Sequence, residues 1–203
     1  MGEWGFSLGL PTGWHEVPAA GAGEARTALA ATGPASTGDA EADAVLARAH
    51  RFASAQGRPA RRHFVYLGGS QPVRARAWAF LELLPRGGVS IAEFATAAAA
   101  TPAAGASSPA ADSPSAGPRF YRRETEQVEL AGLPCVVVHD VVEPGGASAR
   151  ALQQRLVATI FPDDPAIVVR FELSSPDLLV FDDFVRSGVE FANTLRLHEE
   201  APA

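Results

Sequence analysis

Four runs of strand-like sequence follow one another in the second half of the chain: RFYRRETEQVEL (119–130), LPCVVVHDVV (133–142), RALQQRLVATIF (150–161) and AIVVRFELS (166–174). The segments between them are short and rich in Gly, Pro and Asp, which is typical of turns. Short connections predict antiparallel pairing, because parallel strands need a crossover of roughly a dozen residues or more. The second run is apolar at both alternations, so we expect it in the centre of a sheet.

Helical patterns lie on either side of these strands. An apolar stripe at three- and four-residue spacing follows them and comprises Leu178, Phe181, Val185, Val189, Ala192 and Leu195. It predicts a helix that starts at the Ser175-Pro176 cap and lies on the sheet. Upstream, Asp39 can cap a helix that ends near residue 56, and Ser90 with Glu93 forms a capping box for a second helix.

The first half of the chain adds strands and two low-complexity stretches. Alternating apolar residues predict strands at 6–10, 62–67 and 73–84. Residues 19–38 consist mostly of small and turn-forming residues, and we interpret 99–118 as a flexible insertion rich in Ala, Pro and Ser. The sequence therefore predicts one α+β domain over residues 1–203, a central antiparallel β-sheet flanked by helices.

Composition excludes several classes of protein. Ala contributes much of the 47% hydrophobic content, but Leu, Ile, Val and Phe still make up about a quarter of the 203 residues. That share exceeds the roughly 20% below which chains tend to remain disordered, so we expect a core. No apolar run reaches the roughly 18 residues of a membrane helix, and the first residues resemble no secretory signal. We therefore expect no membrane span.

Charge and cysteine usage narrow the class further. The net charge is −6, and all 17 basic residues are Arg. An acidic balance argues against a nucleic-acid-binding protein, and the absence of Lys excludes a P-loop. The single cysteine, Cys135, cannot form an internal disulfide, and with no export signal we expect the protein in the cytoplasm.

The catalytic strings in the sequence have simpler structural explanations. Residues 5–9 read GFSLG and match the G-x-S-x-G string of a hydrolase, but that elbow needs a helix after the serine and Pro11 follows almost at once. Cys135 and His139 share a strand face roughly 13 Å apart, too far for a thiolate–imidazole pair. No spacing matches a metal-binding motif. We expect no catalytic residue, no cofactor and no metal.

Two features are candidates for a binding surface. Glu124 and Glu126 share one face of a predicted strand beside Arg122, and Trp14 follows a turn at the end of the first strand. A charged strand also protects a sheet edge against aggregation, which is the alternative explanation for the first feature. For Trp14, the position after the Pro11-Thr12-Gly13 turn suggests that the ring folds back over one end of the core, and a partner contact is expected only if the ring is half exposed.

The two ends of the chain resemble a known family. The motif FSLGLPTGW (6–14) resembles the opening strand of PsbP/Mog-type domains, and FANTLRL (191–197), which closes the antiparallel strands, resembles the C-terminal half of that family. Actinobacterial relatives combine these elements with Ala/Pro-rich insertions. The resemblance covers the beginning of the chain and about residues 119–197. It implies an α/β/α sandwich that serves as a binding or accessory module, and the acidic charge departs from the basic surfaces of the chloroplast members.

Three functions are compatible with these observations. We favour a non-catalytic accessory module that binds another protein, because the fold signal is present and catalytic strings are absent. The first alternative is a small-ligand-binding protein with a pocket between sheet and helix near Trp14, Trp78 or Phe80. The second alternative is an enzyme whose catalytic residues come together only on folding.

Overall fold

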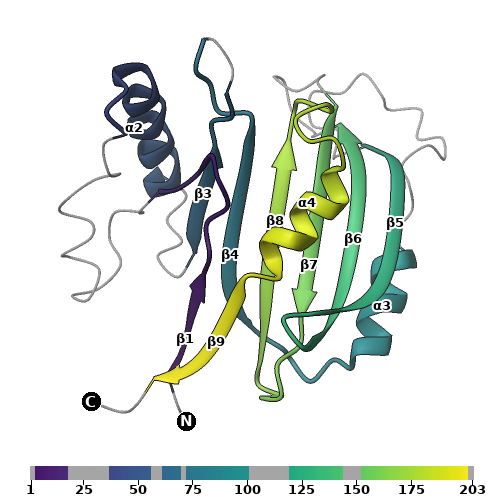
Figure 1. The fold of residues 1–203 in the computed structure, drawn as a ribbon. Helices are drawn as coiled ribbons and strands as arrows, with labels where there is room; N and C mark the ends of the chain where they lie inside the picture. Colours follow the sequence, from purple (N-terminus) through teal and green to yellow (C-terminus); the bar gives the residue numbers. More distant parts are fainter. Residues whose placement is uncertain are drawn as a thin grey trace.

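The computed structural model describes residues 3–17, 37–55, 61–69, 72–100, 119–143 and 152–200. Its main element is an antiparallel sheet of seven strands in the order β2-β3-β4-β8-β7-β6-β5 (Figure 1). These strands are β2 (Trp14–Val17), β3 (Arg62–Tyr66), β4 (Ala77–Pro85), β5 (Arg119–Leu130), β6 (Leu133–Glu143), β7 (Gln153–Ile160) and β8 (Ile167–Ser175). The sheet and its helices confirm the predicted α+β class. The four strands of residues 119–175 are sequential antiparallel neighbours, and β4 joins them at β8.

A separate two-stranded ribbon joins the two ends of the chain. It consists of β1 (Glu3–Leu8) and β9 (Leu195–Glu200), which run antiparallel with Glu3 opposite Glu200 and Leu8 opposite Leu195. In Figure 1 the purple first strand and the yellow last strand lie side by side. The first and last described strands therefore depend on each other for their hydrogen bonds.

Helices lie on both faces of the main sheet. Helix α4 (Phe184–Ala192) crosses one face, which we call the α4 face (Figure 1). Helices α2 (Ala40–Ala55) and α3 (Ile91–Ala100) pack on the opposite face, which we call the α2/α3 face. The expected capping box is present at the start of α3, where the Glu93 carboxylate accepts hydrogen bonds from the backbone N–H and hydroxyl of Ser90.

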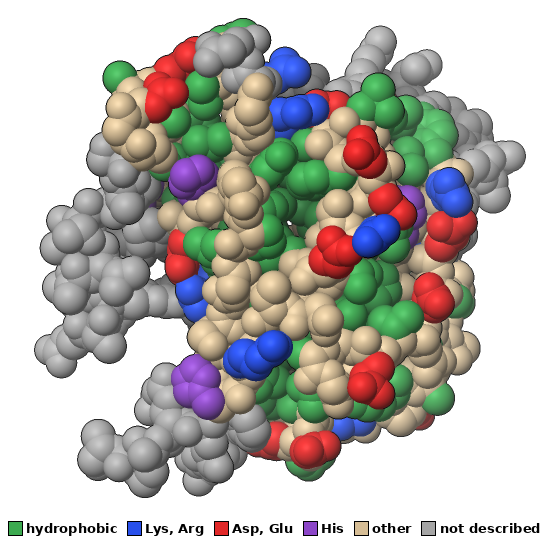
Figure 2. Space-filling view, viewed as in Figure 1, with side chains coloured by type: hydrophobic (Ala, Val, Ile, Leu, Met, Phe, Trp, Pro, Cys, Tyr) green, Lys and Arg blue, Asp and Glu red, His purple; other side chains and the backbone are tan. Residues whose placement is uncertain are grey.

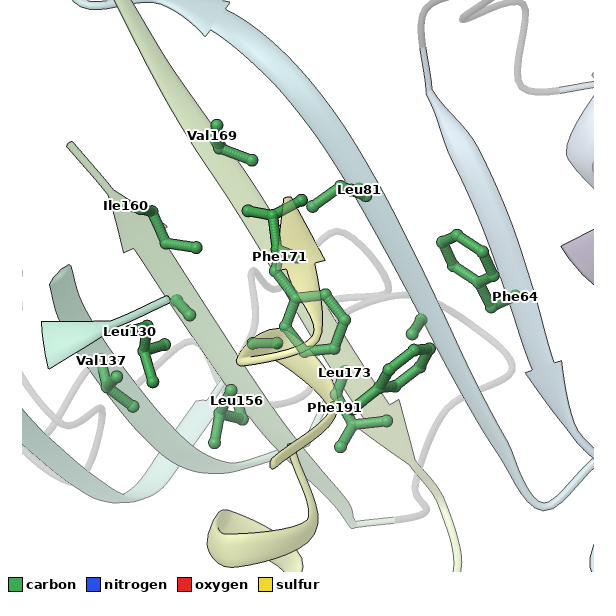
Figure 3. Packing of buried hydrophobic residues seen from close by; sticks show 14 of the residues in the cluster. Phe64, Leu81, Leu130, Val137, Leu156, Ile160, Val169, Phe171, Leu173 and Phe191 are labelled. Carbon is green, nitrogen blue, oxygen red and sulfur yellow. The ribbon is translucent and has the colours of Figure 1, made fainter. Parts of the chain in front are cut away.

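The main core lies on the α4 face. Phe171 of β8 and Phe191 of α4 meet edge to face with ring centroids 5.3 Å apart, and both side chains are buried (Figure 3). Gly188 allows α4 to approach the sheet closely, because a Cβ at this position would lie 3.0 Å from Leu173 Cδ2 and 3.2 Å from Leu156 Cδ1. A small residue on the buried side of the helix therefore sets the spacing of the two layers.

The α2/α3 face carries two smaller cores with a polar band between them. Helix α2 covers an apolar cluster that includes Val65 of β3, and α3 covers another that includes Val136 and Val138 of β6. Between the two helices, the side chains that β4, β8 and β7 direct to this face include several arginines and carboxylates. This band contains the candidate site described below.

Several sequence-based expectations about positions are wrong, and the first concerns the 133–142 run. The 133–142 run is β6, which is next to the edge strand β5, whereas β8 is central. It is apolar at both alternations because α3 covers Val136 on one face while Cys135 enters the main core on the other.

The helix after β8 begins later than the sequence suggests. It starts at Phe184 with Asp183 as its N-cap, and residues 176–183 form turns and bends. Ser175 does not cap this helix but is the last residue of β8. Its hydroxyl donates to the carbonyl oxygen of Arg76 at 2.6 Å and accepts from the N–H of Asp177. The long strand expected at 73–84 likewise begins at Ala77.

The low-complexity stretches fall mostly beyond the described residues. Ala99 and Ala100 end α3, and residues 101–118 of the expected insertion lie outside the described residues. The same holds for residues 19–36 of the first stretch. No helix in the described part of the chain is long and apolar enough to cross a membrane.

Candidate functional site

Three charged side chains lie side by side on neighbouring strands of the α2/α3 face. The register places Arg123 of β5 opposite Asp140 of β6, and Asp140 opposite Arg155 of β7. Arg123 donates from Nε to Oδ1 of Asp140 at 2.6 Å and from Nη2 to Oδ2 at 2.9 Å, and Arg155 donates from Nη2 to Oδ2 at 2.6 Å. The Asp140 side chain is 0% exposed, against 11% for Arg123 and 26% for Arg155. One buried carboxylate therefore bridges two guanidinium groups.

Two opposing effects act on the Asp140 carboxyl. Burial by itself would raise its pKa, because a carboxylate is poorly solvated in the protein interior. The hydrogen bonds and positive charges of Arg123 and Arg155 outweigh burial and hold the pKa of Asp140 below its ordinary value. Asp140 is therefore ionised at neutral pH and keeps both arginines in place.

A further ion pair lies on the same face, closer to the centre of the sheet. Arg170 of β8 donates from Nη2 to Oε2 of Glu172 at 2.6 Å. The guanidinium carbon of Arg170 lies 5.6 Å from the centroid of the Phe80 ring, and that of Arg123 lies 4.2 Å from the Phe120 ring. Aromatic faces attract cations at such distances, so ring packing adds to the ion pairs in fixing these side chains.

These arginines line a cavity of about 290 Å³ between the sheet and α3, which we call the arginine cavity. Its polar lining residues are Arg123, Asp140, Arg155, Thr159 and Arg170. Its apolar lining residues are Leu84, Phe94, Ala98, Val138, Val157 and Val168. The cavity therefore combines an apolar wall, part of it from α3, with a cationic floor on the sheet.

The cationic floor has more donors and more positive charge than the described part of the chain satisfies. Among the described residues, the buried Nε atoms of Arg155 and Arg170 have no hydrogen-bond acceptor. Three arginines at the cavity are paired with two carboxylates, those of Asp140 and Glu172. Counted over the residues that the structure describes, one positive charge is thus left over, and an anion would compensate it.

Another ion pair lies beside the arginine cavity, between Arg61, which directly precedes β3, and Glu82 of β4. Arg61 donates from Nη2 to Oε2 of Glu82 at 2.8 Å, and its guanidinium carbon lies 3.8 Å from the centroid of the Phe80 ring. Burial, aided by the charge of Arg61, lowers the pKa of His63 from 6.5 to about 4, although Glu82 acts in the opposite direction. His63 is therefore neutral at pH 7 and adds no charge to this face.

The structure separates the residues predicted as a binding surface. Trp14 is 8% exposed and lies in the main core, where its ring centroid is 4.7 Å from that of Phe191. Arg122 and Glu124 are both exposed on β5 and form an ion pair at 2.6 Å, and Glu126 is exposed on the same strand. The structure thus brings Arg122 and Glu124 together, with Glu126 two residues along the strand, but it places Trp14 in the interior.

Arg122, Glu124 and Glu126 lie on the face of the sheet opposite to the arginine cavity. Arg122 pairs in register with Val141 and Glu124 with His139, whereas Arg123 pairs with Asp140, and successive side chains of a strand alternate between faces. On the α4 face, basic and acidic side chains are interspersed, and the described residues there form no extended patch of one sign (Figure 2). The ion pairs of Arg123, Arg155 and Arg170 lie on the other face, the α2/α3 face.

Sequence reasoning missed the residues of the arginine cavity. Their signal was present, because Asp140 interrupts an otherwise apolar run and Arg155 and Arg170 alternate with apolar residues in their strands. An exposed strand face shows the same alternation. Only the register of the strands brings the side chains of Arg123, Asp140, Arg155 and Arg170 together. Trp78 and Phe80, which the sequence placed near a possible pocket, lie on the same face, and Phe80 packs against Arg170.

Other chemistry-bearing residues are dispersed. Cys135 is buried, and burial raises the pKa of its thiol to about 12. Within the described ranges, no group of three His, Cys, Asp or Glu side chains is arranged to hold a metal ion. Ser7 is exposed on β1, opposite Arg196 of β9.

Comparison with known proteins gives only a distant structural similarity. No family model matches the chain, and no curated protein matches it. The crystal structure of LpqN, a protein involved in cell envelope biogenesis of Mycobacterium tuberculosis, is similar at 14% sequence identity with a TM-score of 0.46. The match covers 97% of this chain and 84% of LpqN. Membership of the PsbP/Mog-type family remains a prediction from the sequence.

Proposed function

We propose that this protein is a non-catalytic binding protein that takes a small ligand into the arginine cavity. The observation that carries the proposal is a cavity of about 290 Å³ with an apolar wall and a surplus of cationic donors. Ligand pockets are typically about 300–1,000 Å³, mostly apolar, with a few placed polar groups that orient the ligand. The arginine cavity is at the lower end of this range, which favours a small molecule. Of the functions compatible with the sequence, the geometry supports the small-ligand alternative best.

The absence of catalysis is part of the proposal. A nucleophile needs a neighbouring base and donors for the developing negative charge. The Cys135 thiol is buried and stays protonated because of its raised pKa, and Ser7 lies on a two-stranded ribbon. Turnover of activated esters and labelling by a fluorophosphonate probe test this point. Turnover and labelling that both disappear in Ser7→Ala would contradict it, whereas background turnover equal in wild type and variant is expected.

A cavity-filling substitution tests ligand binding. Ala98 lines the cavity on α3, whereas Ala99 is exposed on the same helix. We expect Ala98→Phe to fill the cavity and Ala99→Phe to leave it open. Thermal shift is measured with a panel of short-chain alcohols, amides, carboxylates and phosphate esters, because a ligand that binds the native state raises its Tm.

The expected result is a set of compounds that stabilise wild type and Ala99→Phe but not Ala98→Phe. A panel in which no compound stabilises the wild type, or in which both variants respond like wild type, would overturn the proposal. Both variants are first shown to fold by circular dichroism, so that a lost response reports the cavity and not the fold.

A second candidate role, binding of another protein, rests on β5. This strand has 12 residues, is an edge strand of the described sheet, and exposes Arg122, Glu124 and Glu126. An extended peptide can add to such an edge through backbone hydrogen bonds. The charge-reversed pair Arg122→Glu with Glu124→Arg keeps the local ion pair but changes the surface, and loss of a co-purifying partner specifically in this variant is the expected result. Partners unchanged by the reversal would count against this role.

We also propose a cytoplasmic location, which rests on the sequence alone. Fractionation of cells that carry the full chain with a C-terminal tag tests it. Recovery with the cell envelope fraction would contradict this part of the proposal.

A further inference from the structure

We infer that the ligand of the arginine cavity is an organic monoanion, with a carboxylate held by Arg155 and Arg170 and a short apolar body against α3. This inference deepens the proposed function and depends on it. Three observations lead to it: the charge balance of the cavity, the number of hydrogen bonds that each of its arginines gives to the protein, and the composition of its wall.

The charge balance determines the number of negative charges. Arg123, Arg155 and Arg170 line the cavity and carry three positive charges. Among the described residues, the carboxylates paired with them are Asp140, which lines the cavity, and Glu172, which pairs with Arg170, and these carry two negative charges. The neighbouring pair of Arg61 and Glu82 cancels itself. Unbalanced charge in a partly buried site is unfavourable, so a single negative charge is the best complement. A phosphate monoester, with close to two charges at neutral pH, would leave a negative excess.

The arginines differ in how fully the protein uses them. Arg123 gives two hydrogen bonds to Asp140 and its side chain is 11% exposed, so it serves the structure. Arg155 and Arg170 each give one Nη2 to a carboxylate, and their Nε atoms have no acceptor among the described residues. Their side chains are 26% and 35% exposed, so their guanidinium groups can turn toward a ligand. The guanidinium fork matches a carboxylate, which accepts two parallel hydrogen bonds.

The wall of the cavity determines the rest of the ligand. Six apolar side chains line it, with Phe94 and Ala98 on α3 facing Val138, Val157 and Val168 on the sheet, and Leu84 beside them. Transfer of an alkyl or aryl group from water to such a surface is favourable, whereas transfer of an inorganic anion to an apolar surface is not. A free inorganic ion would therefore leave most of the cavity unused.

Matched eight-carbon probes test the charge requirement. Binding of octanoate, 1-octanol and octyl phosphate to the full-length protein is measured by titration calorimetry at fixed ionic strength. The expected order is octanoate first, with 1-octanol and octyl phosphate each at least tenfold weaker. Equal affinity for octanoate and octanol, or tighter binding of octyl phosphate, would overturn the inference.

Matched substitutions test the residues. Arg155→Gln removes one of the two arginines that give a single hydrogen bond to a carboxylate, and Arg122→Gln removes one positive charge on the opposite face. We expect Arg155→Gln to weaken octanoate binding at least tenfold and Arg122→Gln to leave it unchanged. Arg155→Lys keeps the charge without the fork and should fall between the two, which provides a readout if Arg155→Gln folds poorly. Unchanged octanoate affinity in both Arg155 variants would contradict the inference.

The outcomes separate this inference from the proposed function. If octanol binds as well as octanoate and Ala98→Phe abolishes both, the cavity binds ligands but does not select a monoanion. If Ala98→Phe changes the binding of no probe, the cavity itself is not the site, and the proposed function fails together with the inference.

Discussion

At the scale of single residues, we expect Asp140 to contribute strongly to the stability of the fold, although the sequence alone does not single it out. Its side chain is fully buried and neutralises guanidinium groups from two neighbouring strands. Removing one partner of a buried ion cluster leaves the other charges uncompensated. We expect Asp140→Asn to lower the free energy of unfolding by about 2–4 kcal/mol, measured by urea denaturation.

Glu124→Gln is the matched control, because Glu124, like Asp140, is a carboxylate paired with an arginine. Here the partner is Arg122, and both side chains are more than half exposed. An exposed ion pair contributes only about 0–1 kcal/mol, so this variant should be close to wild type.

Because the folded-state pKa of Asp140 is lowered, its contribution is present above the ordinary aspartate pKa and is lost as pH falls through the folded-state value. Equal stability of Asp140→Asn and wild type at pH 7 would contradict this account.

His63 makes the free energy of unfolding depend on pH in a range above that of Asp140. Burial is the main reason that the pKa of His63 is about 4 in the folded chain, against 6.5 for an unperturbed histidine. Between these values the unfolded chain binds a proton that the folded chain does not, so the free energy of unfolding falls as pH decreases from 6.5 to 4. The full effect is about 3 kcal/mol. We expect His63→Phe to remove most of this slope, measured by denaturation at several pH values, and the exposed-site variant His198→Gln to retain it.

A slope in His63→Phe equal to that of wild type would show that other groups cause the acid sensitivity. The substitution suits the site, since Nε2 of His63 is buried and has no hydrogen-bond partner among the described residues. The Phe80 ring already lies 6.4 Å from that of His63, centroid to centroid.

At the scale of secondary-structure elements, the turn between β5 and β6 is strained at one residue. Ala131 has φ of +54° and Gly132 has φ of +78°, so both central residues of a two-residue hairpin turn are left-handed. This turn geometry favours Asn followed by Gly, because Asn tolerates positive φ better than Ala does. We expect Ala131→Asn to raise the free energy of unfolding by about 0.5–1 kcal/mol, measured by urea denaturation.

Gly132→Ala provides the opposite change, since it introduces a Cβ at a left-handed position. We expect it to destabilise the protein by about 1 kcal/mol or more. The N–H of Ala131 donates to Oδ1 of Asn193 at 2.7 Å, and this bond should persist in both variants because only side chains change. A destabilised Ala131→Asn protein would mean that the new side chain disturbs this contact with the end of α4.

At the scale of the whole molecule, one core connects distant parts of the chain. The cluster on the α4 face includes Trp14 of β2, Phe64 of β3, Phe171 of β8, Phe191 of α4 and Leu195 of β9. Because the elements share this core, we expect one cooperative unfolding transition with calorimetric and van't Hoff enthalpies in agreement. Two separate transitions in scanning calorimetry would contradict the single domain predicted for residues 1–203.

The sequence alone was sufficient for the local features of this fold. Alternation within residues 119–174 predicts the strands, the Ala131-Gly132 turn predicts a hairpin, and Ser90 with Glu93 predicts the start of α3. Each of these depends on residues close together in the chain, so a short stretch contains the whole signal. The sequence also predicted the antiparallel character of the sheet, because short connections permit no other arrangement.

Only the tertiary structure decided the strand order and the candidate site. The pairing of β4 with β8, with Trp78 opposite Ser174, joins strands that are far apart in the sequence, and nothing local to either strand specifies the other. The start of α4 was misjudged for the same reason, since the hydroxyl of Ser175 bonds to the carbonyl of distant Arg76. The arginine cavity takes residues from β4, β5, β6, β7, β8 and α3, each of which reads in isolation as part of an ordinary strand or helix. Charge surplus and unpaired donors are properties of side chains brought together by register and burial, and they exist only once the chain has folded.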